Sequence, residues 1–312
     1  MSKTILITGA STGIGKAGAL ELGRRGWKVF VHARSAARGN PVLDELKKSA
    51  PNAEFVLVTG DVSSMAEVKS LAGQVKAQTE TLDVLWNNAG LMLNERQVSV
   101  DGWEMTMAIN HLAPFVLTRE LLPLIEQIQG RIITTSSGGY MFGSFNWDDW
   151  MDEKSTYSSF KAYSKSKLAN ILFTRELAHR VGAKSVTAHC FHPGMVSTEF
   201  GRQRGEEKQK SYVPGGLFRS CSCLPRKQAP IQVFSSRKTR PQKTAMENIG
   251  KSARSAEQRV LTTILMQSNC GNSAKKQPVN SLSFIEYNQR NQRSFQCTQQ
   301  ICTKVCSLKP SP

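Results

Sequence analysis

The chain has 312 residues, enough for one large α/β domain or two small ones, and a formal net charge of +17. The charge is uneven, because residues 202–312 hold 20 of the 41 Lys and Arg but 5 of the 24 Asp and Glu. An apolar run begins at Thr4 and none reaches the ~20 residues of a membrane span, so we expect neither a spanning helix nor a cleaved signal peptide. We therefore expect a soluble protein of the cytoplasm or another reducing intracellular compartment, not a secreted one.

Short apolar, β-branched runs alternate with longer amphipathic stretches through residues 1–201, which is typical of a parallel sheet with crossover helices. The short runs predict strands at Thr4–Thr8, Lys28–Ala33, Glu54–Thr59, Leu82–Asn87, Arg131–Ser136 and Ser185–His192. The longer stretches predict helices at Gly15–Gly26, Asn40–Ser49, Ser64–Glu80, Gly102–Ile128 and Ala162–Val181. Such units, wound right-handedly, predict the α/β class with a doubly wound parallel sheet.

A glycine-rich stretch, TGASTGIG, joins the first predicted strand to the first predicted helix. Glycine lets the backbone approach a pyrophosphate closely, and the helix N-terminus offers unpaired N–H groups. The stretch therefore predicts a dinucleotide site formed by Gly9, Ser11, Thr12, Gly13, Ile14 and Gly15. For this motif alone, a glycine-rich turn without a ligand is the alternative.

The end of the second strand lacks the acid that usually binds the ribose 2′-hydroxyl of NAD. Arg34 stands there instead, and with Lys16 it offers positive charge to a 2′-phosphate. We therefore prefer NADP(H) as cofactor and keep NAD(H) as possible; a solvated loop arginine is the other interpretation of Arg34. Asp61, which precedes Val62, is predicted to accept a hydrogen bond from adenine or to be an acid at a helix N-terminus.

Several motifs stand in the order and spacing of the short-chain dehydrogenases/reductases. They are the glycine loop, the NNAG of Asn87–Gly90, Asn110, Ser136-Ser137, Tyr163 with Lys167, and His192-Pro193-Gly194. Residues 1–201 resemble this family, and Lys161–Arg180 resembles its retinol dehydrogenase-like branch. The resemblance implies a Rossmann-type catalytic domain at 1–201 that transfers hydride between NADP(H) and a lipophilic carbonyl or alcohol, and it implies a homo-oligomer as one possible assembly.

The resemblance also implies a role for each residue of the site. Tyr163 would be the general acid/base, and Lys167, one helical turn away, would favour its phenolate and bind the nicotinamide ribose. Ser137, rather than Ser136, would hold the substrate oxygen, and Asn110 would anchor a water of a proton relay. The other cofactor-binding positions would be Val62, Asn88, Ala89, Gly90, Pro193, Gly194, Val196 and Thr198, while Asn87 would tie strands together.

Aromatic residues are frequent between Ser137 and Tyr163. They are Tyr140, Phe142, Phe145, Trp147 and Trp150. They predict an apolar pocket wall or lid for an aldehyde, ketone, retinoid or steroid, with packing on the core as the alternative. No metal site is predicted, because His111, His189 and His192 lack paired spacing and supporting carboxylates.

The segment 202–312 is basic, rich in Ser and Gln, and contains six of the seven cysteines. We expect it to be largely disordered apart from a helix that begins at Ser255–Gln258, a capping-box pattern. The family's last strand is not recognisable here, so an alternative exon or a shifted reading frame is our hypothesis for this segment. Two alternative functions follow: a non-catalytic nucleotide-binding or scaffold protein, and, less favoured, a basic-tail binder of nucleic acid or anionic lipid.

Overall fold

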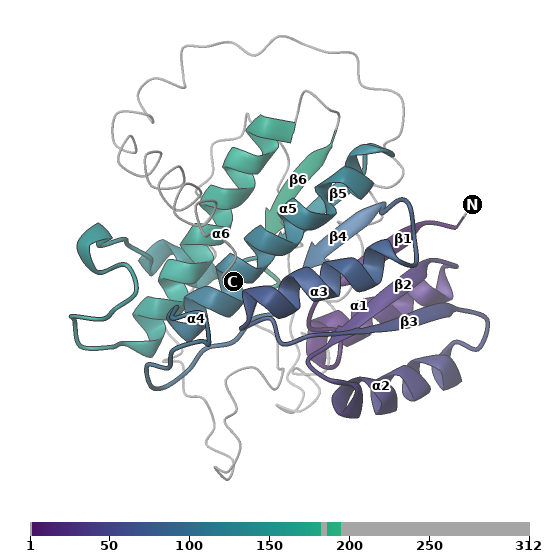
Figure 1. Cartoon of the computed structure of the whole chain (residues 1–312), viewed down its shortest axis with the longest axis horizontal. Coiled ribbons are helices and arrows are strands. Elements are labelled where there is room, and N and C mark those ends of the chain that lie inside the picture. Colours follow the sequence, from purple (N-terminus) through teal and green to yellow (C-terminus); the bar gives the residue numbers. More distant parts are fainter. Residues whose placement is uncertain (1, 182–185, 195–312) are drawn as a thin grey trace, which may run out of the picture.

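The sheet of this protein is parallel and runs through the centre of the domain (Figure 1). A computed structural model describes residues 2–181 and 186–194. Its six strands stand in the order β3-β2-β1-β4-β5-β6. They are β1 (Thr4–Ile7), β2 (Lys28–Ala33), β3 (Glu54–Thr59), β4 (Val84–Asn87), β5 (Arg131–Thr135) and β6 (Thr187–Phe191). This confirms the doubly wound sheet, whose strand order reverses between β1 and β4, where such sheets bind ligands.

Helices cover the two faces of the sheet. The helices α1 (Gly13–Arg24) and α2 (Ala36–Ser49) pack on one face, and α3 (Met65–Lys76), α5 (Ala113–Glu126) and α6 (Ser159–Val181) cross the other (Figure 1). The chain steps outward from β1 to β3, returns to β4, and then steps outward the other way. Because each crossover is right-handed, that reversal moves the helices to the opposite face.

The strand β1 shows how the sequence builds both layers. Ile5 and Ile7 pack into the cluster beneath α1 and α2, whereas Leu6, between them, packs into the cluster beneath α3, α5 and α6. Successive side chains of a strand point to opposite faces, so a strand buried on both faces must be apolar throughout. This is why continuous apolar runs, rather than alternating ones, marked the strands.

The predicted helix Gly102–Ile128 is three consecutive helical pieces. They are α4 (Met105–Met107), the π-helix η1 (Ala108–Leu112) and α5. In an α-helix the backbone N–H of residue 114 would bond the carbonyl of Asn110, but Pro114 has no N–H. The Ala113 N–H bonds the carbonyl of Ala108 instead, and the free Asn110 carbonyl accepts a 2.9 Å hydrogen bond from Nδ2 of Asn170 in α6.

The boundaries of the other elements differ from the prediction by a few residues. The helix predicted from Asn40 begins at Ala36, so Pro41 lies inside it. The helix predicted from Ser64 has Ser64 as its N-cap, and the Ser64 Oγ accepts from the Glu67 N–H. In the part of the chain that the structure describes, no helix combines the length and hydrophobicity needed to cross a membrane. The expected helix at Ser255 and the expectations for segment 202–312 lie outside the described residues.

Candidate active site

The glycine loop packs so closely that side chains would not fit. Gly9 has a φ of +63°, and a Cβ on it would lie 2.8 Å from Cα of Ala89. A Cβ on Gly15 would lie 2.5 Å from the carbonyl oxygen of Gly9. Thr12, the N-cap of α1, makes no side-chain cap hydrogen bond, and the first turn of α1 carries no acid. The loop therefore fits a dinucleotide pyrophosphate, which would take up the N–H groups at the start of α1.

The NNAG segment is joined to the glycine loop by Thr8. The Thr8 Oγ1 accepts from the backbone N–H groups of Asn88 and Ala89, both at 2.9 Å, and Asn88 Nδ2 donates to the Thr8 carbonyl at 3.0 Å. The prediction that Asn87 ties strands together is wrong, because its Nδ2 bonds Oγ1 of Thr118 in α5 at 3.1 Å. Neighbouring strand residues point to opposite faces, so Asn88 makes the link between strands instead.

The two positive charges expected at a 2′-phosphate are each paired with an acid. Lys16 lies 2.6 Å from Glu45, and Arg34 Nε lies 3.6 Å from Asp61 Oδ2. Asp61 also accepts from the Ser63 N–H at 2.9 Å, so it stands near the start of the loop between β3 and α3, beside Arg34. Both ion pairs are partly exposed, and such pairs exchange partners at little cost.

His32 is a residue of the cofactor region that the sequence interpretation missed. The Gly9 N–H donates to its Nδ1 at 3.0 Å, and its Nε2 lies 2.9 Å from the Gly60 carbonyl. Burial lowers the pKa of His32, although the Gly60 hydrogen bond and the Asp61 charge raise it. The ring is therefore neutral with its proton on Nε2, and it joins the glycine loop to the end of β3. A lone histidine at a strand end carried no signal that could distinguish this role.

The helix α6 carries Tyr163 and Lys167 on one face, beside the carboxyl end of β5. Lys167 Nζ lies 5.5 Å from the Tyr163 ring centroid and donates to the Thr135 carbonyl at 3.1 Å. Tyr163 shares a side-chain hydrogen bond with Ser137, whose Oγ accepts from the Gly139 N–H at 3.2 Å. Ser136 points elsewhere: its buried Oγ donates to the backbone carbonyl of Lys167 at 3.0 Å.

Burial is the largest influence on the pKa values of Tyr163 and Lys167. It raises the pKa of Tyr163, while the Ser137 hydrogen bond lowers it to a smaller extent. It also lowers the pKa of Lys167 to about 8. Burial outweighs the Ser137 hydrogen bond, and the Lys167 ammonium is bonded to Thr135, so the role of Lys167 in favouring the phenolate stays a prediction. Tyr163 is a protonated phenol at neutral pH.

Asn110 is held by hydrogen bonds on every side. Its Oδ1 accepts from the Leu91 N–H at 2.8 Å, and its Nδ2 donates to the Leu91 carbonyl and to Ser166 Oγ, both at 2.9 Å. A Cβ on Gly90 would lie 3.2 Å from Asn110 Oδ1 and 3.4 Å from Lys167 Nζ. The absence of a side chain at Gly90 therefore leaves Asn110 and Lys167 facing one space. The relay through Asn110 stays a prediction.

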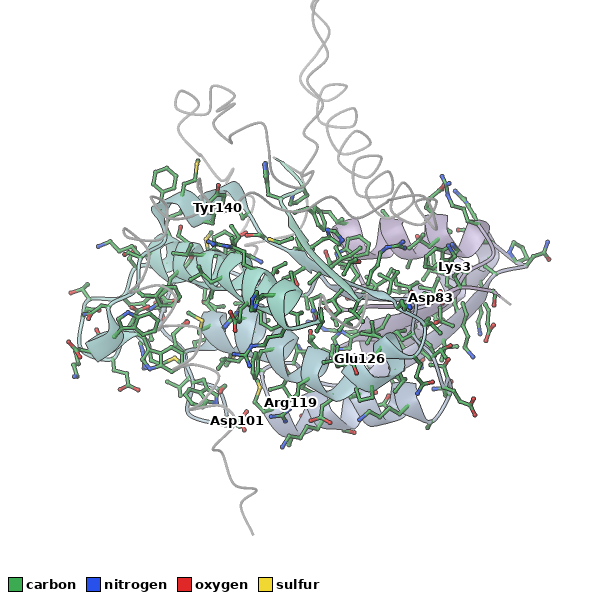
Figure 2. The ribbon with its side chains drawn as sticks, turned by 90° about the horizontal axis from the view of Figure 1, so that it is seen from above. Lys3, Asp83, Asp101, Arg119, Glu126 and Tyr140 are labelled. Carbon is green, nitrogen blue, oxygen red and sulfur yellow. The ribbon has the colours of Figure 1, made fainter. Side chains whose placement is uncertain are left out.

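The aromatic residues of the β5–α6 segment divide into two groups. Phe145 stacks on Trp147 at 4.9 Å, Trp150 packs against Trp103 at 5.7 Å, and all four border the buried core. These follow the packing alternative. Tyr140 and Phe142 lie instead in the short 3-10 helix η2 (Gly138–Phe142), directly after Ser137. Figure 2 shows Tyr140 at the end of the domain remote from Lys3 and Asp83.

The strand β6 ends beside the site at the HPG segment. Gly194 has a φ of +82°, and its N–H donates to His192 Nδ1 at 3.3 Å. Val196 and Thr198 lie outside the described residues. Within residues 2–181 and 186–194, no group of three or more His, Cys, Asp and Glu side chains is arranged to hold a metal ion.

The sequence of this domain matches a known family model. Residues 3–209 match the model described as short chain dehydrogenase. The chain belongs to the short chain dehydrogenase family. Among curated relatives, human retinol dehydrogenase 14 is 39% identical over 64% of this chain and 63% of its own length. Human retinol dehydrogenase 13 is 36% identical over 72% of this chain and 66% of its own. The chain thus spans less than two thirds of these relatives.

Solved structures agree with the family assignment. An uncharacterized protein from Mycobacterium Paratuberculosis is similar at a TM-score of 0.55 and 35% identity, over 62% of this chain and 68% of that one. An alcohol dehydrogenase from the archaeon Thermococcus sibiricus, complexed with 5-hydroxy-NADP, has a TM-score of 0.52 and 25% identity, over 64% and 80%. The chain is therefore a member of the short chain dehydrogenase family with a retinol dehydrogenase-like sequence.

Proposed function

We propose that this protein is an oxidoreductase that uses NADP(H) to reduce a lipophilic carbonyl or to oxidise the corresponding alcohol. The observation that carries the proposal is the grouping of Tyr163, Ser137 and Lys167 at the carboxyl end of β5. That grouping lies at the same edge of the sheet as the glycine loop, across the point where the strand order reverses. Proton transfer and cofactor binding would therefore share one site.

A bound nicotinamide would supply or accept the hydride. Tyr163, protonated because burial raises its pKa, would donate its phenolic proton to the carbonyl oxygen during reduction. The Ser137 hydroxyl, bonded to Tyr163, would hold that oxygen in place and stabilise the charge that develops on it. Lys167 would hold the nicotinamide ribose and supply positive charge behind the phenol. In alcohol oxidation the same phenolic oxygen would accept the proton.

The preference for NADP(H) over NAD(H) rests on charge. Arg34 is 55% exposed at the end of β2, and its partner Asp61 is 3.6 Å away, which is long for an ion pair. A 2′-phosphate would offer Arg34 stronger, charge-assisted hydrogen bonds than this carboxylate does. Lys16 stands in the first turns of α1 and adds a second charge. The archaeal alcohol dehydrogenase that is complexed with 5-hydroxy-NADP supports the same preference.

The lipophilic substrate class rests on apolar side chains near Tyr163. Met141, Phe142 and Phe160 are 52%, 48% and 50% exposed, and the Phe142 and Phe160 rings lie 5.5 Å apart. Phe160 precedes Tyr163 by one turn of α6, and η2 begins directly after Ser137. A group of large apolar side chains left at the surface beside reacting groups suits an apolar ligand. The names of the retinol dehydrogenase relatives support this class.

The test is NADPH oxidation by the full chain with a panel of lipophilic aldehydes and ketones, alongside Tyr163→Phe. We expect turnover that the variant loses, while NADPH binding, measured by fluorescence, is retained. Tight NADPH binding without turnover would instead support the nucleotide-binding alternative. Absence of NADPH and NADH binding would refute the proposed function.

A further inference from the structure

Trp86 places a large indole side chain, whose N–H is a hydrogen-bond donor, at the centre of the sheet. It lies in β4, is fully buried, and belongs to the core cluster beneath α1 and α2. A Cβ on Gly18 would lie 2.5 Å from Cζ3 of Trp86, so α1 passes directly over the indole. The Trp86 and Phe191 ring centroids are 6.1 Å apart. The indole therefore sits between the helix that follows the glycine loop and the strand that ends in the HPG segment.

The indole N–H begins a directed chain of hydrogen bonds. Trp86 Nε1 donates to Thr135 Oγ1 at 2.9 Å, and the Thr135 hydroxyl donates to Asn88 Oδ1 at 3.4 Å. Asn88 Nδ2 then donates to the carbonyls of Thr8 and Gly9, at 3.0 and 3.4 Å. Indole is a donor without an acceptor, so it occupies a lone pair of Thr135 and leaves the single hydroxyl proton for Asn88.

Thr135 also holds the proposed active-site lysine. Its backbone carbonyl accepts from Lys167 Nζ at 3.1 Å. One residue thus connects the lysine to the glycine loop, and Trp86 determines the direction of the Thr135 hydroxyl. If the Asn88 amide turned over, its Oδ1 would face the carbonyls of Thr8 and Gly9, which is repulsive.

We infer that Trp86 is a positioning residue for cofactor binding. It acts through Thr135 and Asn88 on the conformation of the glycine loop, and through Thr135 on the position of the Lys167 side chain. This inference rests on the proposed function, since the loop is taken to bind NADP(H). Trp86 touches no reacting atom. Its role is to direct the Thr135 hydroxyl proton to Asn88 Oδ1, which holds the Asn88 amide against the Thr8 and Gly9 carbonyls before the cofactor arrives and reduces the ordering that binding would otherwise require.

The test compares Trp86→Phe with Trp27→Phe. Both tryptophans are buried in the same core cluster, and both variants replace indole by a smaller ring. We expect Trp86→Phe to weaken NADPH binding about three- to tenfold, the range for loss of one buried hydrogen bond, while Trp27→Phe changes it less than about twofold. Thr135→Val should weaken NADPH binding by the same factor as Trp86→Phe, whereas Thr135→Ser, which keeps the hydroxyl, should bind NADPH as the unaltered chain does. The Trp86→Phe/Thr135→Val double variant should bind NADPH no more weakly than either single variant.

A second measurement needs no cofactor. Amide hydrogen exchange of the peptide that spans Thr8–Gly15 should accelerate in Trp86→Phe and not in Trp27→Phe. Equal effects of the two tryptophan variants in both measurements, or strictly additive effects of Trp86→Phe and Thr135→Val, would overturn the inference. If the unaltered chain bound no NADPH, the proposed function would fail, and hydrogen exchange would still decide whether Trp86 orders the loop.

Discussion

Lys165 of α6 forms a 2.7 Å ion pair with Asp152, and its side chain is 5% exposed. The same ammonium donates to the Trp150 carbonyl at 2.7 Å. The segment between β5 and α6 is therefore attached to the helix of Tyr163 and Lys167 by a buried charge. Removal of one partner leaves the other charged and desolvated, which is more costly than loss of a surface pair.

Lys165→Met should destabilise the fold by about 3 kcal/mol, the lower end of the range for breaking a buried pair. It should also raise KM for carbonyl substrates more than the Kd for NADPH, because the segment contains η2, where we propose that the lipophilic substrate binds. Urea unfolding and steady-state kinetics check the two effects. Glu21→Gln breaks the exposed pair with Arg25 and should cost less than about 1 kcal/mol. Equal costs in the two variants would contradict the prediction.

Lys167→Met should increase stability at pH 7 while it abolishes turnover. Burial lowers the pKa of Lys167 to about 8 from an ordinary value of 10.5, so the native state releases this proton first as the pH rises. The unfolded state then binds more protons between pH 8 and 10.5, and the stability of the unaltered protein should rise across that interval. The variant should lack the rise, and Lys161→Met, at an exposed position of α6, should keep it. Urea unfolding at several pH values measures both.

Ser137→Ala and Ser136→Ala should have different effects although the residues are neighbours. Ser137 bonds Tyr163, so its loss should lower kcat about a hundredfold with little change in NADPH binding. Ser136 bonds the Lys167 backbone, so its loss should cost ~1 kcal/mol of stability and leave most of kcat. Steady-state kinetics with thermal unfolding distinguishes them; a greater loss of kcat in Ser136→Ala would reverse the assignment.

Arg34→Ala should weaken NADPH binding about tenfold or more and leave NADH binding nearly unchanged, since only NADPH carries the 2′-phosphate. Glu45→Gln removes the acid that lies 2.6 Å from Lys16 and should strengthen NADPH binding by a small factor. Titration of both nucleotides by fluorescence at one fixed ionic strength measures these changes. Parallel losses for the two nucleotides in Arg34→Ala would show that Arg34 does not contact the phosphate.

Glycines in two helices should respond oppositely to alanine. At Gly73 in α3, no atom lies within 4 Å of an added Cβ, so Gly73→Ala should stabilise the protein by about 0.5–1 kcal/mol. At Gly18 in α1, the Cβ would meet Trp86, so Gly18→Ala should destabilise by about 1–3 kcal/mol through overpacking. Urea unfolding of both variants is the measurement, and stabilisation by Gly18→Ala would show that the indole can move away.

Features that depend on local pattern were predictable. The strands were found because both faces of the sheet are buried, and the glycine loop because its residues are contiguous. The π-helix was missed because it depends on Pro114 together with Asn170 of a distant helix. The proton on His32 and the hydrogen bond of Trp86 depend on partners that only the folded sheet brings close. Likewise, the division of the aromatic residues into core and surface groups required the three-dimensional contacts.

The adjacency of β1 and β4 has a consequence for how the protein is made. Thr8 hydrogen-bonds Asn88, which the ribosome adds 80 residues later. Asn110 hydrogen-bonds Ser166, which follows it by 56 residues. Since α1 and α2 can form beforehand but β1 lacks its second neighbour until β4 emerges, the nucleotide loop cannot be complete early in translation. A cofactor that binds this loop would thus stabilise only chains that extend past β4, and shorter nascent chains would fold without that help.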